Sequence, residues 1–489
     1  HAPGGCRHRD TPPIDEGVAH SSAARSTITL YQGGQAKQTA ELEATQCPTG
    51  CASGLFLPGN VTIFTGGKCE NFSFLLSFRI FAVILVGIVK YIERAEYLKT
   101  LRELKDKHFI KVITGVRRAG KSTLMQLFRE EIVGRVAREQ TQSYNFEDPK
   151  YNEMADWREI YTLIDSKLIK DKPNYIFLDE VQSVPEFEKL LDGLYINENI
   201  DLYVTGSNAY LLSSELATLL TGRAYEINIL PFSFKEFAQT YTTPVDNSIK
   251  FEHFMRYSAF PQATELMHQN PTLVPNYLRG VYQSILIKDM LPRKQIYAER
   301  SFEGVINYVM DSIGSSLSPN SIARTLANEN KAVDSRTVNT YLKSLCDSFV
   351  LYKAERFDIK GKQNLTTQEK YYTVDLGFRN LLLGKEVGQD AGHLLENIIY
   401  LELRRQGNEI WVGKIGEREV DFVARDNKGY LTYYQVAYTV RDEAVLEREL
   451  TPFDKIPDHN PKILITLDPE EVSRSGVRQI NAINWLLSD

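Results

Sequence analysis

The 489-residue chain has few cysteines and few tryptophans, five and three, and nearly all of it lacks long apolar runs. Only Cys346 lies beyond residue 70, which excludes a disulfide scaffold. The scarcity of apolar runs excludes a polytopic membrane protein. Positive charge is not in excess either, since 57 Lys and Arg face 63 Asp and Glu. Binding to nucleic acid would therefore require a local basic patch.

What remains is the composition of a folded protein, with 43% hydrophobic and 25% charged residues. At about 150 residues per domain, the length predicts about three domains. Alternating strand and helix patterns after residue 90 predict an α/β fold with a parallel sheet, in which a ligand binds at the carboxyl ends of the strands.

Residues 1–89 differ from the rest of the chain. Gly, Pro, Ser, Thr and Ala are frequent and no helical or strand period is sustained, as is typical of disorder. Cys47 and Cys51 have the spacing of half a metal site, without a second close pair. The apolar stretch 72–89 is about long enough to span a membrane but contains Arg79. We favour the interpretation that 1–89 is a non-native extension, translated from a misplaced start, over a membrane anchor.

A phosphate-binding loop is predicted directly after a buried strand at 109–114. The pattern G-x-x-x-x-G-K-S is complete and is followed by a helical period. Backbone N–H groups and the helix start would bind phosphate oxygens. Lys121 would neutralise the β and γ phosphates, and Ser122 would ligate Mg²⁺. The predicted ATP-binding residues are Gly115, Val116, Arg117, Arg118, Ala119, Gly120, Lys121, Ser122 and Thr123.

A pair of carboxylates follows a second apolar run at 175–178. Asp179 is predicted to hold Mg²⁺ through water at the end of a buried strand beside the loop. Glu180 is predicted to orient and deprotonate the attacking water. After a phosphate loop at this distance, the two acids predict hydrolysis of ATP rather than binding alone.

Two further residues are candidates for catalysis, together with Lys121 and Glu180. Asn208 follows a third strand, at 200–205, and would hold the attacking water or sense the γ-phosphate; an asparagine in a turn is the alternative. Arg223 precedes a fourth strand and would stabilise transition-state charge in its own chain or in a neighbouring subunit; a surface arginine is the alternative.

The segments GVRRAGKST, FLDEVQ, TGSNA and TGRAYEINILPFSFKEF occur in this order and together resemble the AAA+-related ATPases of bacteria and archaea. The resemblance covers about residues 90–489. It implies ATP binding, slow hydrolysis, and a winged helix and a C-terminal domain after the ATPase core. The family's Gly-Gly-Phe-Pro box reads Ser-Ala-Phe-Pro at 258–261, a departure from the pattern.

The expected architecture is a P-loop core with a parallel sheet, a helical lid, a winged helix and a C-terminal α/β nuclease-like domain. The expected boundaries are 1–89 for the extension, 90–240 for the core, 241–315 for the lid, 316–385 for the winged helix and 386–489 for the last domain.

Two amphipathic helices and a strand pair in 316–385 match a winged helix. In that fold the second helix enters the major groove of DNA. A winged domain with a structural role and solvated charges is the alternative. The predicted contacts to DNA phosphates are Arg336, Lys343, Lys360 and Lys362.

Residues 386–489 are similar to the PD-(D/E)xK nucleases, which place a helix glutamate, a strand aspartate and then an E-x-K strand together. Glu402 and Asp421 match the first two positions. Gln435 and Ala437 stand where the second acid and the lysine would be, and alanine has no group that activates water. We therefore expect a nuclease-like fold without cleavage.

The sequence as a whole predicts a cytoplasmic ATPase that uses ATP and Mg²⁺ and couples hydrolysis to a rearrangement of its lid against the C-terminal parts. Three alternatives remain open: a DNA-binding regulator that uses ATP as a switch, an active nuclease, and a kinase for a small molecule. The oligomeric state is open as well.

Overall fold

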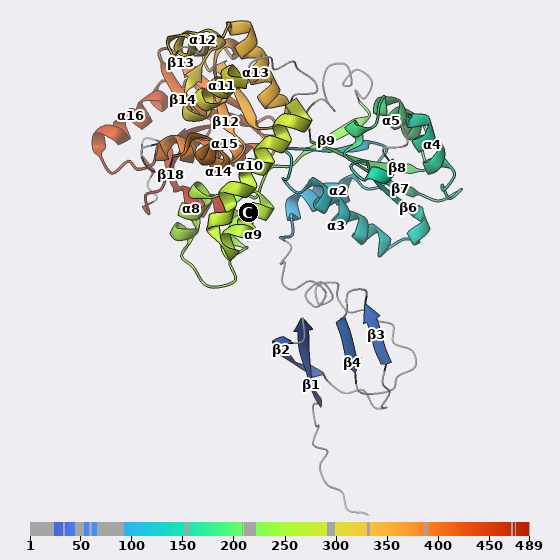
Figure 1. Ribbon diagram of the computed structural model, residues 1–489. Helices are drawn as coiled ribbons and strands as arrows, with labels where there is room; N and C mark the ends of the chain where they lie inside the picture. The colour runs from blue at the N-terminus through green and yellow to red at the C-terminus, as the bar shows by residue number, and fades with distance from the viewer. Residues whose placement is uncertain are drawn as a thin grey trace, which may run out of the picture. The chain divides into compact units, whose positions relative to one another are not determined.

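The computed structural model of the chain divides into two units, His1–Lys90 and Tyr91–Asp489 (Figure 1). It describes residues 24–32, 35–44, 53–57, 61–65, 92–151, 156–207, 209, 222–290, 299–329, 333–385, 388, 390–470, 473–474 and 476–488.

The first unit contains two antiparallel strand pairs, where the sequence predicts no regular element. β1 (Ala24–Gln32) pairs with β2 (Gln35–Ala44), and β3 (Ser53–Leu57) pairs with β4 (Val61–Thr65). The cysteine pair 47 and 51 and the apolar stretch 72–89 lie outside the described residues. That 1–89 is a non-native extension stays a prediction.

The second unit begins with a five-stranded sheet whose order is β6-β7-β8-β5-β9. All neighbouring strands in it are parallel, which confirms the predicted α/β class. The strands are β5 (Ile110–Thr114), β6 (Thr141–Asn145), β7 (Asn174–Asp179), β8 (Ile200–Gly206) and β9 (Ala224–Asn228).

Helices cover both faces of this sheet because its strands are apolar on both sides. α2 (Ala95–Leu104) and α3 (Lys121–Val133) lie on one face, and α4 (Trp157–Asp165) and α5 (Phe187–Tyr195) lie on the other (Figure 1). Neighbouring residues of β7 show the alternation. Phe177 packs in the cluster of Phe128 from α3, whereas Ile176 packs in the cluster of Leu190 from α5.

A helical segment follows the sheet, where the lid is expected. Its first helix begins at Ser233, which forms a capping box with Glu236. The π-helix continues α10 directly. The elements are α7 (Phe234–Ala238), α8 (Asn247–Arg256), α9 (Pro261–Gln269), α10 (Val274–Ser284), the π-helix η6 (Ile285–Met290) and α11 (Glu299–Asp311).

A second, mixed sheet occupies the rest of the chain, in the order β10-β12-β11-β13-β14-β15-β16-β18-β17. The hairpin of β11 and β12 is antiparallel, and β11 then pairs in parallel with β13. The strands expected in two separate domains therefore form one continuous sheet. Its strands are β10 (Ser316–Leu317), β11 (Leu351–Asp358), β12 (Gln363–Thr373), β13 (Glu409–Ile415), β14 (Arg418–Arg425), β15 (Leu431–Val436), β16 (Lys462–Thr466), β17 (Ser473–Arg474) and β18 (Val477–Asn481).

Six helices of the described residues accompany this sheet: α12 (Pro319–Asn328), α13 (Ser335–Asp347), α14 (Leu376–Leu383), α15 (Ala391–Arg405), α16 (Glu443–Asp454) and α17 (Ala482–Leu487). Ser318 caps the start of α12, since its hydroxyl accepts from the Ser321 amide.

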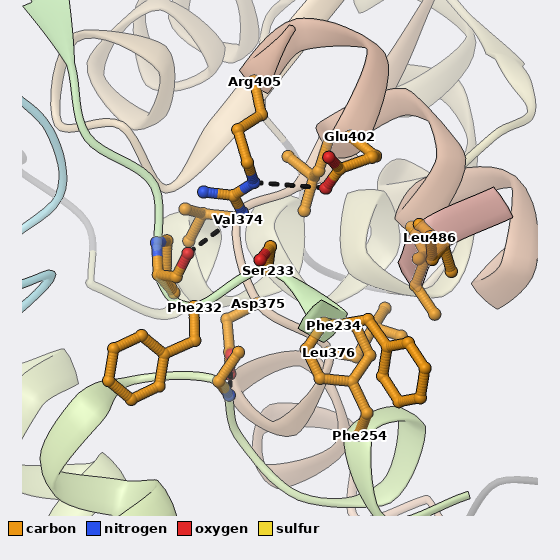
Figure 2. Close-up of a pocket in the computed structure, with 14 residues that line it drawn as sticks. Phe232, Ser233, Phe234, Phe254, Val374, Asp375, Leu376, Glu402, Arg405 and Leu486 are labelled. Atoms are coloured by element: carbon orange, nitrogen blue, oxygen red, sulfur yellow. Dashed lines mark hydrogen bonds and ion pairs between the residues drawn. The ribbon is translucent and has the colours of Figure 1, made fainter. Parts of the chain in front are cut away.

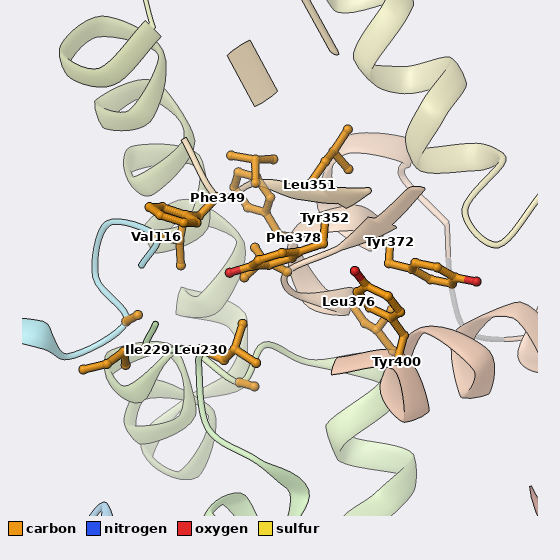
Figure 3. Close-up of a cluster of buried hydrophobic side chains, with 14 of the residues drawn as sticks. Val116, Ile229, Leu230, Phe349, Leu351, Tyr352, Tyr372, Leu376, Phe378 and Tyr400 are labelled. Carbon is orange, nitrogen blue, oxygen red and sulfur yellow. The ribbon is translucent and has the colours of Figure 1, made fainter. Parts of the chain in front are cut away.

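One apolar core runs from the first sheet into the second. Val116 of the phosphate loop and Leu230 after β9 belong to the same buried cluster as Tyr352 of β11 and Phe378 of α14 (Figure 3). The Tyr352 hydroxyl also donates to Asn228 Oδ1 at 3.2 Å. The phosphate loop and the second sheet are therefore joined by direct packing.

Within the part of the chain that the structure describes, no helix combines the length and the apolar character needed to cross a bilayer.

Candidate nucleotide site

The phosphate loop lies between β5 and α3, at the carboxyl end of the sheet. Gly115 has φ +141°, and a Cβ there would lie 2.2 Å from the carbonyl oxygen of Ile229. Gly120 has φ +99° and precedes α3, whose first turn has no side-chain cap. The free backbone N–H groups at the start of α3, a 13-residue helix, thus point into the loop, where they can bind an anion.

Lys121 lies over this loop and is almost fully buried. Its Nζ donates to the carbonyl oxygens of Gly115 and Val116 at 3.0 and 3.2 Å, and Glu180 Oε1 lies 3.8 Å away. Burial lowers the pKa of Lys121, while the Glu180 carboxylate opposes that change. An ammonium in this position is prepared to bind a phosphate oxygen.

The two predicted Mg²⁺ ligands contact each other. Ser122 Oγ donates to Asp179 Oδ1 at 3.0 Å, and the hydroxyl of Thr205 at the end of β8 donates to the same oxygen. Burial raises the pKa of Asp179, although the two hydroxyls lower it. A hydroxyl and a buried carboxylate are the oxygen donors that Mg²⁺ prefers, and a cation would stabilise the charged form of this acid. The residues fit the predicted metal.

Glu180 is held in an unusual backbone conformation, with φ +53° and ψ +49°. Its amide donates to Thr205 Oγ1 at 2.9 Å. Its carboxylate accepts from Gln182 Nε2 and from Ser207 Oγ, the latter at 3.1 Å. A left-handed conformation is uncommon outside glycine and is retained where the surroundings fix it. The result is a buried carboxylate near Lys121 with a defined position.

The side chain of Arg117 extends from the loop to the lid. Its guanidinium forms two bonds to Asp289 of η6, at 3.0 and 3.1 Å, and one to Glu147 at 2.9 Å. Burial disfavours the cation, but Asp289 and the neighbouring acids raise its pKa. Arg118, in contrast, is exposed.

Arg94 contacts the phosphate loop, and the sequence did not mark it as a site residue. It is 5% exposed and donates to the carbonyl oxygens of Ala119 and Leu230 at 3.1 and 2.7 Å, and to Glu236 at 2.8 Å. No motif marks such a residue, because its three acceptors come from three separate segments.

The outcome differs for the two other predicted catalytic residues, Asn208 and Arg223. Asn208 lies outside the described residues; its neighbour Ser207 donates to the Glu180 carboxylate. The carbonyl of Arg223 accepts from the amide of Ile110, at the start of β5 and so at the opposite end from the loop. Its side chain pairs with Asp192 on the surface. A role for Arg223 within its own chain is therefore unsupported, and a role in a neighbouring subunit stays a prediction.

The acids of the C-terminal sheet are arranged differently from the expectation. Glu402 pairs with Arg405 at 3.2 Å beside a small pocket, and Arg405 also donates to the carbonyl of Pro231 (Figure 2). The helix carboxylate near Asp421 is instead Glu396. The choice of Glu402 was wrong because α15 is buried along most of its length, so helical spacing did not single out one face.

A lysine from the neighbouring hairpin joins these acids. Lys370 Nζ of β12 lies 3.0 Å from Glu396, 2.7 Å from Glu419 and 3.9 Å from Asp421. Burial disfavours the ammonium, but the surrounding carboxylates raise the pKa of Lys370. Burial and Glu396 raise the pKa of Asp421 well above its usual value.

Gln435 and Ala437, which stand in place of the second acid and the lysine of the nuclease pattern, lie beside this cluster. Gln435 accepts from the Asp421 amide at 3.2 Å and donates to Glu449 at 2.8 Å, so its side chain is used by the fold. Ala437 is buried and lines, with Glu396 and Asp421, a cavity of about 630 Å³. The described residues contain no group of three His, Cys, Asp or Glu side chains arranged to hold a metal.

Comparison with known sequences identifies two matching families. One, described as an AAA domain, matches residues 107–238, and the other, a domain of unknown function, matches 249–388. An uncharacterized protein of Haemophilus influenzae is 36% identical over 402 residues, covering 81% of this chain and 98% of that protein. An uncharacterized protein of Methanocaldococcus jannaschii is 29% identical over 364 residues, covering 71% and 78%.

Among solved structures, the Walker-type ATPase PABY2304 of Pyrococcus abyssi is similar over 60% of this chain and 95% of its own, with 15% identity and a TM-score of 0.43.

Proposed function

The chain belongs to the family of the uncharacterized Haemophilus influenzae protein and contains an AAA-type P-loop ATPase domain, and from this premise we propose that it hydrolyses ATP with Mg²⁺. The observation that carries the proposal is the convergence of Lys121, Ser122, Asp179 and Glu180 from two motifs, with Ser122 Oγ 3.0 Å from Asp179 and Lys121 Nζ 3.8 Å from Glu180.

Each residue has a distinct part in this mechanism. The loop amides and Lys121 bind the β and γ phosphates and stabilise the charge that develops on them. Glu180 orients a water for in-line attack and accepts its proton. Ser122 and Asp179 would hold Mg²⁺, which would supply further neutralisation of the phosphate charge.

The test is a steady-state ATPase assay of wild type, Glu180→Gln and Lys121→Ala, with and without DNA. Glu180→Gln should lower kcat by about 10²–10⁴-fold with ATP still retained, because only the base is lost. Lys121→Ala should lose ATP retention. Glu186→Gln, an exposed glutamate six residues on, is the matched control. Equal ATP retention by wild type and Lys121→Ala would refute the site.

The segments 90–240, 241–315, 316–385 and 386–489 act in this proposal as core, lid, winged helix and nuclease-like domain. Coupling of the nucleotide to the lid is supported by the Ser-Ala-Phe-Pro box at 258–261. The Ala259 amide donates to Asp375 Oδ2 at 2.7 Å, and a Cβ on Gly120 would lie 3.8 Å from Pro261. ATP should therefore change protease sensitivity at 251–315. An unchanged cleavage pattern would remove the coupling.

DNA is proposed as a second ligand, through α13 and the tip of the β11–β12 hairpin. Arg336, Lys343, Lys360 and Lys362 are all exposed, and no ion pair involves them among the described residues. Lys343→Glu and Lys360→Glu should weaken duplex binding and lower its salt dependence by about one counterion each. Lys428→Glu, on a distant turn of the same sheet, is the control. Unchanged affinity in both variants would leave the winged helix a structural part.

The last segment is proposed to be nuclease-like without cleavage. Glu396 and Asp421 share Lys370, but Gln435 is bonded within the fold and Ala437 carries no acid or base. Purified protein with Mg²⁺ and duplex DNA should show no cutting. Cutting that disappears in Asp421→Ala would overturn this and restore the nuclease alternative.

A further inference from the structure

Residues 229–231, which follow β9, lie against the beginning of the phosphate loop. The Ile229 amide donates to the Thr114 carbonyl oxygen at 2.8 Å. A Cβ on Gly115 would lie 2.2 Å from the Ile229 oxygen, so the two backbones are in close contact. Ile229 and Leu230 are buried in the apolar core that also contains Val116 of the loop (Figure 3). The loop therefore begins in direct contact with this segment.

The same segment is connected to the end of the loop by Arg94. The guanidinium donates to the carbonyl oxygens of Ala119 and Leu230, at 3.1 and 2.7 Å. Its Cζ lies 4.8 Å from the centre of the Tyr97 ring, and the Tyr97 hydroxyl accepts from the Leu230 amide at 3.2 Å. Segment 229–231 is therefore connected to both ends of the phosphate loop.

Arg405 holds this segment from the C-terminal part of the chain. It is the last residue of α15, and its side chain is 12% exposed. Its two terminal nitrogens donate to the Tyr97 hydroxyl and to the Pro231 carbonyl oxygen, each at 3.0 Å. Its Nε donates to Glu402 of the same helix at 3.2 Å (Figure 2). The donors of a guanidinium lie in one plane with a fixed geometry, so these three bonds form a rigid connection.

We propose that Arg405 is a positioning residue for ATP binding, which holds segment 229–231 against the phosphate loop and so makes the affinity for ATP depend on the position of α15. This inference rests on the proposed ATPase function. α15 also packs against β12, β13, β14 and β15, so Arg405 joins the second sheet to the nucleotide site. A displacement of α15 relative to the first sheet would loosen the loop and weaken ATP binding. By linkage, ATP binding favours the arrangement in which Arg405 keeps its contacts.

The experiment measures the affinity for ATP with Mg²⁺ by isothermal titration, together with kcat and the unfolding temperature. Arg405→Met should weaken ATP binding about tenfold, because segment 229–231 loses hydrogen bonds to a charged donor. It should leave kcat at saturating ATP within about twofold, since no group that acts on water or on the γ-phosphate is changed. Arg425→Met is the matched control and should match wild type in affinity, because Arg425 of β14 pairs with Glu409 at the surface of the second sheet.

A double-mutant cycle with Arg94→Lys tests whether the two arginines act through the same segment. If they do, the double variant should weaken ATP binding about 10–20-fold, rather than the about hundredfold expected of two independent tenfold effects. Tyr97→Phe serves if Arg405→Met does not fold, because it removes one hydroxyl and keeps the ring beside Arg94. The loss of this acceptor should weaken ATP binding about threefold.

Wild-type affinity in Arg405→Met, or in Tyr97→Phe when it replaces that variant, would overturn the inference. A lower unfolding temperature with unchanged affinity would overturn it as well, because Arg405 would then contribute only to the fold. So would a full hundredfold loss in the double variant, because the two arginines would then act independently. Wild type that retains no ATP would instead refute the proposed function, so the two failures are distinguishable.

Discussion

Lys370 of β12 donates to Glu396 of α15 across 3.0 Å, inside the second sheet. The same glutamate accepts from the Tyr372 hydroxyl at 2.7 Å. The hairpin expected in a winged helix and the helix expected in a nuclease-like domain are therefore joined by a buried ion pair as well as by the pairing of β11 with β13. We expect the two segments to unfold as one cooperative unit.

Lys370→Met should destabilise this unit by about 3–5 kcal/mol, because it leaves the Glu396, Glu419 and Asp421 carboxylates without their shared cation. Thermal unfolding followed by circular dichroism measures the loss. Lys353→Met is the control, since its ammonium pairs with Glu355 and Glu369 at the partly exposed surface and should contribute less than about 1 kcal/mol. Equal shifts for the two variants would contradict the account of the buried pair.

The sequence predicted the secondary structure around those candidate-site residues that belong to contiguous motifs. Lys121 and Ser122 lie in one octet, and Asp179 follows an apolar run, so local pattern placed them on the correct elements. Asp289 and Lys370 carried no local signal. Each reaches its partners only because strands or helices distant in sequence pack side by side, which a period along the chain does not encode.

The type of each secondary-structure element was easier to predict than the way in which the elements assemble into sheets. The parallel sheet followed from strand and helix alternation. That β11 would pair with β13 did not follow, because edge pairing depends on which strand edges are left open after each part folds. Glu396, rather than Glu402, lies near the β14 aspartate, and the sequence did not show this because α15 is buried along most of its length.

Gly115→Ala should abolish ATP retention and lower the unfolding temperature. The new Cβ would lie 2.2 Å from the backbone oxygen of Ile229, and φ is +141°, so neither the contact nor the conformation is tolerated. Gly134→Ala, at the other end of α3, has ordinary contacts of 3.6 Å and should behave like wild type. The measurement is the retention of each variant on immobilised ATP. Retention by Gly115→Ala equal to that of Gly134→Ala would refute the predicted loop geometry.

Arg94→Lys should weaken ATP binding about tenfold. A lysine keeps the charge but cannot donate to Ala119, Leu230 and Glu236 together, as the planar guanidinium does. The phosphate loop therefore loses the hydrogen bonds that fix its position. Isothermal titration with ATP and Mg²⁺ gives the affinity. Arg102→Lys is the control, because Arg102 of α2 forms an exposed ion pair with Glu131 of α3, and this variant should leave the affinity unchanged. If both variants bind ATP like wild type, Arg94 does not contribute to nucleotide binding.

Deprotonation of Asp375 should lower the free energy of unfolding as the pH rises. Burial raises the pKa of this aspartate from 3.8 to about 6 in the folded chain, although the amides of Ala259 and Phe378 and the side chain of Ser258 lower it. Because the folded pKa lies above the unfolded one, the native state holds the extra proton between these values. Its contribution is then fully present below about pH 4 and is lost as the pH rises through about 6, with a ceiling of ~3 kcal/mol.

The measurement is the difference in unfolding temperature between wild type and Asp375→Asn, from about pH 4.5 to about pH 7. The asparagine does not titrate, so wild type should lose stability relative to the variant across this range. Asp246→Asn is the matched control, because Asp246 caps α8 at the surface and hydrogen bonds from Ser248 lower its pKa. Its stabilising effect is complete above its unfolded pKa, so that difference should stay flat. A flat difference for Asp375 as well would mean that the buried cap of α14 is charged throughout, and that the contact between the 258–261 box and α14 does not depend on pH.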